Sequence, residues 1–271
     1  MNLLKCFFFY LNALSVDIAI VAAIGFISIN KTFDISSRPE LLILLVFGTL
    51  MVYWFDHFRD IQIYGKNISR RHYLLFKIRT PLFFLIGLFI LIGLFLVVNY
   101  FNQRDYVLSF FLFVFMLIYL LFHQFLNKWI ILKKEILISL LYTFSICFQV
   151  MMDCPTNTIF LAGLILFTVL YGVITVSIIE SKFDLLHQIP NIYSGLKMKN
   201  ALLVFMYVFP AITILLAVFS DLFLIYFVSL ILIQLLHLLM FKLINQFRFI
   251  QSNYRIISEW SFGLQILVLL F

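Results

Sequence analysis

Charged residues are scarce in this sequence. Asp, Glu, Lys and Arg make up 11% of its 271 residues, whereas 65% of the residues are apolar. Soluble domains carry about 25% charged residues, so the composition excludes a soluble globular fold and predicts an integral membrane protein in contact with membrane lipids. Because each helical crossing needs about 20 apolar residues, the chain is better divided by crossings than by soluble domains.

The sequence also lacks a disulfide framework, a signal-peptide cleavage site and a polar linker between domains. The three cysteines, Cys6, Cys147 and Cys154, have neither the number of a disulfide framework nor the spacing of a metal site. The N-terminal stretch MNLLKCFFFYLNALS has no small-residue cleavage site, so we interpret it as the first membrane segment. The net charge of +7 does not indicate nucleic-acid binding, because the basic residues lie in short loops between apolar runs. No polar linker divides the chain, so we expect one transmembrane domain over residues 1–271.

Apolar segments follow one another along the whole chain. They predict an all-α integral membrane protein, a helical bundle with nine transmembrane helices. The segments cover approximately residues 7–29, 40–59, 81–101, 106–126, 136–152, 158–180, 200–219, 222–241 and 256–271.

Basic residues lie almost entirely on one side of this predicted topology. If the helices alternate in direction, 16 of the 19 Lys and Arg residues fall on the side of the N-terminus, and only Lys31, Arg38 and Arg104 fall on the other. Positive residues are enriched in cytoplasmic loops. We therefore expect a cytoplasmic N-terminus and a multi-pass membrane protein.

Two pairs of acidic residues end the second and sixth segments on that same side. Asp56 and Asp60 are four residues apart, and so are Glu180 and Asp184. This spacing places both acids of a pair on one helix face, where like charges repel each other and oppose the helix dipole. A shared Mg²⁺ ion, which prefers carboxylate and phosphate oxygens, would remove the conflict. The acids predict a Mg²⁺–diphosphate site near the long basic loops; the alternative is that they simply face water at the membrane boundary.

These motifs resemble those of the UbiA-type intramembrane prenyltransferases. Asp56 and Asp60 match the two acids of the family's first motif, NxxxDxxxD, and Val52 stands at the position of its asparagine. Glu180 and Asp184 match the second motif, DxxxD, with glutamate as the first acid, and the stretch IPNIYSGLK follows as in the family.

The resemblance implies an activity. It implies the Mg²⁺-dependent transfer of a prenyl group from an allylic prenyl diphosphate to a lipophilic or aromatic acceptor, with the four acids as catalytic metal ligands. Trp129, at the position of a family tyrosine, and Asp17, an ionisable residue inside the first segment, are candidates for the acceptor cavity. The candidate diphosphate-binding residues are Lys66, Arg70, Arg71, Lys133 and Lys134.

Two other functions stay open at this stage. A terpene cyclase on the same scaffold would ionise a diphosphate without an acceptor, and a catalytically degenerate protein that binds or transports lipids would have the same hydropathy. A transporter is disfavoured because the acids gather at one membrane surface instead of the midplane. The acceptor, the length of the prenyl chain and the oligomeric state are left open by the residues.

The distribution of basic residues makes a prediction about topology. Single cysteines placed in loops 60–80, 127–135 and 181–199 should resist an impermeant thiol reagent applied to intact cells, because the positive charges hold these loops in the cytoplasm. Labelling after permeabilisation provides the control. Labelling of loop 181–199 in intact cells would contradict both the orientation and a shared face for the two acidic motifs.

Overall fold

The structure is a computed structural model of the chain. It describes residues 3–65, 70–107, 109–110, 112–114, 116, 133–153, 155–186, 199–218, 224–244 and 246–270. Within these ranges the regular structure consists of helices, with no β-strand. The all-α prediction is confirmed.

Several helices are long and apolar enough to cross a membrane. Five satisfy both criteria, and a bent pair formed by α1 (Leu3–Ala13) and α2 (Val16–Thr32) gives a sixth if it counts as one crossing. These helices support a multi-pass membrane protein. The five are α3 (Pro39–Tyr64), α5 (Arg79–Tyr100), α7 (Lys133–Asp153), α8 (Pro155–Leu186) and α11 (Leu224–Leu243).

The remaining predicted segments have different outcomes. The segment at 200–219 forms α10 (Lys199–Val218), which has Pro210 in its interior and a shorter apolar stretch, Val204–Leu215. Most of the segment at 106–126 lies outside the described residues. The last segment, at 256–271, is not one continuous helix.

That C-terminal segment instead divides into three short elements. α12 (Arg248–Ser261) is followed by a 3₁₀-helix, η1 (Phe262–Ile266), and by α13 (Leu267–Leu270). Both of the last elements pack against α2. The Ser28 hydroxyl donates a hydrogen bond to the carbonyl of Gln265 at 2.8 Å, and the Lys31 ammonium donates one to the carbonyl of Leu269 at 3.0 Å.

The first predicted segment, at 7–29, is also broken. α1 and α2 meet at an angle of 78°, and Ser15 between them has a left-handed backbone with φ 58° and ψ 21°. The Trp54 indole of α3 donates to the carbonyl of Leu14 at 2.8 Å, which satisfies an acceptor that the break exposes. Asp17 therefore lies in the first turn of α2, where an acid is favoured by the helix dipole, and not in the middle of a longer helix.

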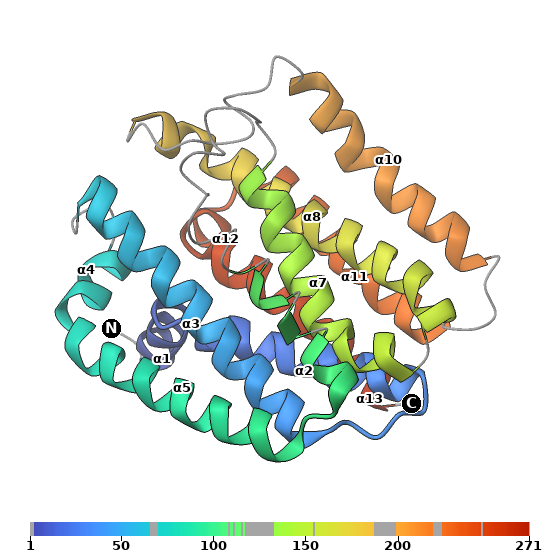
Figure 1. Cartoon of the computed structure of the whole chain (residues 1–271). Helices are drawn as coiled ribbons and strands as arrows, with labels where there is room; N and C mark the ends of the chain where they lie inside the picture. The colour runs from blue at the N-terminus through green and yellow to red at the C-terminus, as the bar shows by residue number, and fades with distance from the viewer. Residues whose placement is uncertain are drawn as a thin grey trace.

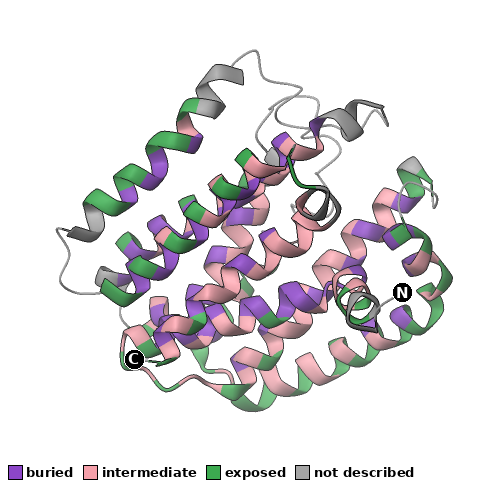
Figure 2. Ribbon diagram, turned by 180° about the vertical axis from the view of Figure 1, so that it is seen from behind, coloured by how far each residue is buried: buried purple, intermediate pink, exposed green. Residues whose placement is uncertain are grey.

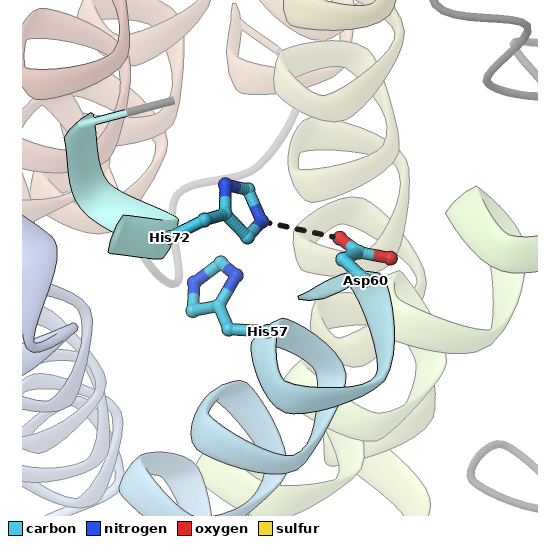
Figure 3. A group of neighbouring side chains, drawn as sticks. All are labelled: His57, Asp60 and His72. Carbon is cyan, nitrogen blue, oxygen red and sulfur yellow. Dashed lines mark ion pairs between the residues drawn. The ribbon is translucent and has the colours of Figure 1, made fainter. Parts of the chain in front are cut away.

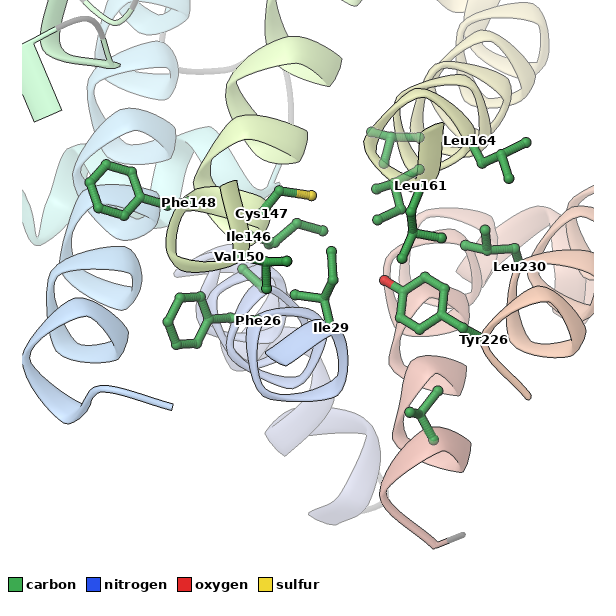
Figure 4. Packing of buried hydrophobic residues seen from close by; sticks show 14 of the residues in the cluster. Phe26, Ile29, Ile146, Cys147, Phe148, Val150, Leu161, Leu164, Tyr226 and Leu230 are labelled. Carbon is green, nitrogen blue, oxygen red and sulfur yellow. The ribbon is translucent and has the colours of Figure 1, made fainter. Parts of the chain in front are cut away.

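α2 occupies the centre of the bundle (Figure 1). It packs against α3 on one side, α7 on another, and the C-terminal elements on a third. The main apolar core joins α2 to α7, α8 and α11 (Figure 4), and its buried side chains include Phe26, Ile146, Leu161 and Tyr226. Cys147 is completely buried in this core, as expected for a packing residue.

α5 and α10 lie at the outside of the bundle (Figure 2). α5 has a mean hydropathy of 3.0 over its most apolar window, yet only Leu82 and Ile86 are buried along it. A helix that is apolar all round but packs along a narrow stripe is suited to contact with lipid. This agrees with the membrane assignment.

A polar cluster ties the bundle together at the end where α3 begins. Arg38 binds Asp105 through two bonds of 3.0 and 3.2 Å and binds Glu40 at 2.6 Å. The Gln149 side chain of α7 accepts from the Arg38 backbone at 3.0 Å and donates to the carbonyl of Ser36 at 2.8 Å. Burial disfavours the charged form of Arg38, but the hydrogen bonds that its guanidinium donates to the Glu40 and Asp105 carboxylates raise its pKa.

Two glycines of α8 predict opposite responses to the same change. A Cβ atom on Gly172 would lie 2.8 Å from the Phe262 ring and 2.9 Å from the His237 ring, whereas one on Gly163 would meet nothing within 4 Å. Gly172→Ala should therefore destabilise the fold by about 1–3 kcal/mol through overpacking. Gly163→Ala should be neutral or stabilising, because alanine favours a helix. Thermal unfolding of both variants in detergent tests this, and equal midpoints would contradict the packing of η1 on α8.

Candidate functional site

Asp56 stands in the wall of an apolar cavity. The cavity has a volume of about 390 Å³ and is bounded by α2, α3, α5, α7 and residues 109–116. Val52 and Asp56 lie one turn apart on the α3 face that lines it, and Thr49 and Tyr53 lie beside them. The volume is in the range of small-molecule pockets. Its apolar lining includes Phe26, Leu45, Phe101, Leu112, Phe113 and Phe148.

Asp60, one turn further along α3, has different neighbours. It faces α4 (Arg70–Lys77), where the His72 imidazole lies 3.7 Å from the Asp60 carboxylate. The His57 ring completes the group (Figure 3), meeting the His72 ring edge to face with centroids 5.3 Å apart. The predicted acid pair is thus divided between an apolar cavity and a histidine cluster.

Arg71 of α4 lies at the centre of a buried polar network. Its guanidinium donates a hydrogen bond to Ser15 Oγ at 3.0 Å and another to His57 Nε2. Burial lowers the pKa of Arg71, although the carboxylates of Glu259 and Asp17 act in the opposite direction. The structure therefore places this candidate diphosphate ligand in the interior, whereas Arg70 is exposed.

Asp17 joins this network from α2. The Asn12 amide donates to the Asp17 carboxylate at 2.9 Å and also to Glu259 of α12. Tyr53, which lines the apolar cavity, is within electrostatic reach of Asp17, Asp56 and Glu259. Tyr53 therefore stands between the cavity and the polar network.

The second acidic motif approaches the same region from α8. Glu180 forms an ion pair with Arg255 of α12 and accepts a hydrogen bond of 2.5 Å from the Tyr254 hydroxyl. Glu180 also lies within electrostatic reach of Arg71, and Figure 1 shows the C-terminal ends of α3 and α8 at the same end of the bundle. Glu180 of the second motif is thus within reach of Arg71, which contacts His57 beside the first motif.

Some predicted site residues lie outside this description. Lys66 and Trp129 are outside the described residues. Asp184 belongs to α8, and Lys133 and Lys134 belong to α7, but their side chains are outside the description.

The sequence predictions missed several members of the network. Arg255 was counted only among the basic residues on the side of the N-terminus, His72 was not singled out, and Glu259 lay inside the last apolar segment. Glu259 carried a usable signal, because an ionisable residue within an apolar segment usually faces a cavity or a partner. His72 offered no comparable signal, since its neighbours in space come from another helix.

The site thus combines an apolar cavity with a charged region at one end of the bundle. Such a junction can accommodate an amphiphile, with its apolar part in the cavity and its anionic part near Arg71 and Arg255. Comparisons of the chain with protein-family models, characterised proteins and solved structures give no match.

Proposed function

We propose that this protein is a Mg²⁺-dependent intramembrane prenyltransferase of the UbiA type. It would transfer a prenyl group from an allylic prenyl diphosphate to a lipophilic or aromatic acceptor. The observation that carries the proposal is the position of Asp56, a carboxylate in the wall of an apolar cavity beside a network that contains Arg71. A prenyl diphosphate has the apolar tail and the charged head that this junction suits.

The proposed topology has nine crossings with the N-terminus and the active-site loops in the cytoplasm. Its support is the one-sided distribution of basic residues. The five or six candidate crossings in the described part of the chain are compatible with it. The common location of the α3 and α8 ends supports one face for both acidic motifs.

The four acids would hold Mg²⁺. Carboxylate oxygens are the donors that Mg²⁺ prefers, and Asp56 and Asp60 come from successive turns of α3. Glu180 is engaged by Arg255, so it would become a ligand only when that contact opens. When bound, Mg²⁺ would supply positive charge for the departing diphosphate.

The residues of the chain would divide the reaction between them. When the allylic C–O bond breaks, its electron pair would leave with the diphosphate, and the positive charges of Arg71 and Arg255 would stabilise that anion. The Tyr53 ring borders the cavity and can stabilise the allylic cation through its aromatic face. The acceptor then donates an electron pair to form the new bond and releases a proton, while the apolar lining excludes water that would otherwise capture the cation.

Charge-neutral variants of the acids test the metal assignment. Asp56→Asn, Glu180→Gln and Asp184→Asn should each lower Mg²⁺-dependent pyrophosphate release by about 100-fold, the size expected when one electrostatic group of an active site is removed. Glu180→Asp keeps the charge and should be mild, and Val52→Asn should strengthen Mg²⁺ binding by adding an oxygen ligand. The matched control is Asp34→Asn, because Asp34 is exposed and its φ of 53° suits asparagine.

The measurement is pyrophosphate release by purified protein as a function of Mg²⁺ concentration, with and without membrane lipid extract. Prenylated acceptor supports the proposal, whereas cyclised hydrocarbon indicates a cyclase and no turnover indicates a lipid-binding protein. Because Glu180 also pairs with Arg255, thermal unfolding of each variant separates lost metal binding from lost stability. If the wild type is active and all three charge-neutral variants release pyrophosphate at the same rate, the acids do not bind the metal and only face water at the membrane boundary.

The cavity makes a separate prediction about the prenyl tail. Gly48 lines the cavity, and a Cβ atom there would meet nothing within 4 Å, so Gly48→Leu should fill part of the space without a clash. We expect at least tenfold weaker use of long prenyl diphosphates and a smaller effect on short ones, roughly in line with the 1–3 kcal/mol that pocket contacts contribute. Gly87→Leu on exposed α5 is the matched control, since it also meets open space. If Gly48→Leu and Gly87→Leu showed the same preference between long and short prenyl diphosphates, the cavity would not be part of the substrate site.

A further inference from the structure

His57, Asp60 and His72 form a compact group of potential metal ligands (Figure 3). His57 and Asp60 are three residues apart on α3, which places them on one helix face. His72 reaches them from α4, and one donor atom from each residue lies within 4.8 Å of the others. The two imidazoles are buried, and the Asp60 side chain is 24% exposed. A ligand bound here would be largely shielded from solvent.

The donor set selects a particular class of cation. Two imidazoles and one carboxylate suit Zn²⁺ and related first-row transition metals, whereas Mg²⁺ prefers oxygen ligands alone. Tetrahedral bonds of 2.0–2.1 Å would bring the donors to about 3.4 Å from one another. Because the observed separations are at most 4.8 Å, side-chain adjustments on the order of an ångström would close the site.

We propose that His57, Asp60 and His72 bind a divalent transition metal of the Zn²⁺ class, and that this metal competes with Arg71 for His57. A neutral imidazole has one nitrogen available as an acceptor, since the other carries a proton. Arg71 donates to His57 Nε2 and thus uses that acceptor. Whichever nitrogen coordinates the metal, Arg71 loses this hydrogen bond when the metal binds.

The Arg71 guanidinium would keep other polar partners after the metal displaced it from His57. It already donates to Ser15 Oγ, and the carboxylates of Asp17 and Glu259 lie within its electrostatic reach. Metal binding would therefore shift the guanidinium from the α3–α4 group toward the break between α1 and α2. The metal would also tie α4 to α3, since two of its ligands come from one helix and the third comes from the other.

The probe is Co²⁺ alone, added to metal-free, tag-free, full-length protein in detergent without substrate. We expect the intense visible bands of four-coordinate Co²⁺ to saturate at one equivalent, to be displaced by Zn²⁺ and to resist excess Mg²⁺. Loss of an outer-shell partner already costs 10–100-fold in metal affinity, so His57→Ala or His72→Ala should cost at least about 100-fold. Arg71→Met should tighten binding by about tenfold or more, because it removes both a competing donor and a nearby positive charge.

His237→Gln is the histidine control: His237 of α11 is hydrogen-bonded to Ser258 and lies outside the three-ligand group, so this variant should retain the wild-type titration. No saturable Co²⁺ band, displacement by Mg²⁺, or a titration unchanged in both histidine-to-alanine variants would overturn the proposal. Weaker binding in Arg71→Met would overturn the competition with Arg71. The proposal does not depend on prenyl transfer: failure of that function would appear as absent pyrophosphate release with an unchanged Co²⁺ titration.

Discussion

Placing a guanidinium inside a membrane protein requires polar groups from several directions, and Arg71 imposes this requirement on the fold. An arginine remains charged even when buried, and leaving its charge uncompensated is expensive. The compensation comes from the α1–α2 break through Ser15, from α2 through Asp17 and from α12 through Glu259. The bend in the first segment and the position of α12 can both be understood as ways to supply these partners.

The same network separates the two acids of α3. Asp56 borders an apolar cavity and Asp60 contacts a histidine, although they are one turn apart. Asp60 is therefore shared: it belongs both to the four acids proposed to hold Mg²⁺ and to the three residues proposed to bind a transition metal. Arg71 contacts His57, which lies between these two acids in sequence, and is also within electrostatic reach of Glu180.

Hydropathy predicted the helical class and located α3, α5, α7, α8 and α11 well, because long apolar runs need no partner to identify them. It could not predict the break at Ser15, since the Leu14 carbonyl and the Ser15 hydroxyl there accept hydrogen bonds from Trp54 and Arg71, which come from elsewhere in the chain. Helix ends were also underestimated: α8 continues to Leu186 because hydropathy marks the end of an apolar run and not the end of a helix. Within the candidate site, Asp56 and Arg71 were found from sequence, but the contacts of His72, Arg255 and Glu259 depend on tertiary packing.

The attachment of η1 and α13 to α2 has a consequence for biosynthesis. α2 is translated well before η1 and α13, yet Ser28 and Lys31 donate hydrogen bonds to Gln265 and Leu269. Membrane helices such as α3 and α5 can insert as they are made, whereas the centre of the bundle must wait for a segment translated more than 200 residues later. Until then the face of α2 that binds η1 and α13 is uncovered. A nascent chain stalled before η1 would therefore expose polar groups of α2 to lipid or to a chaperone.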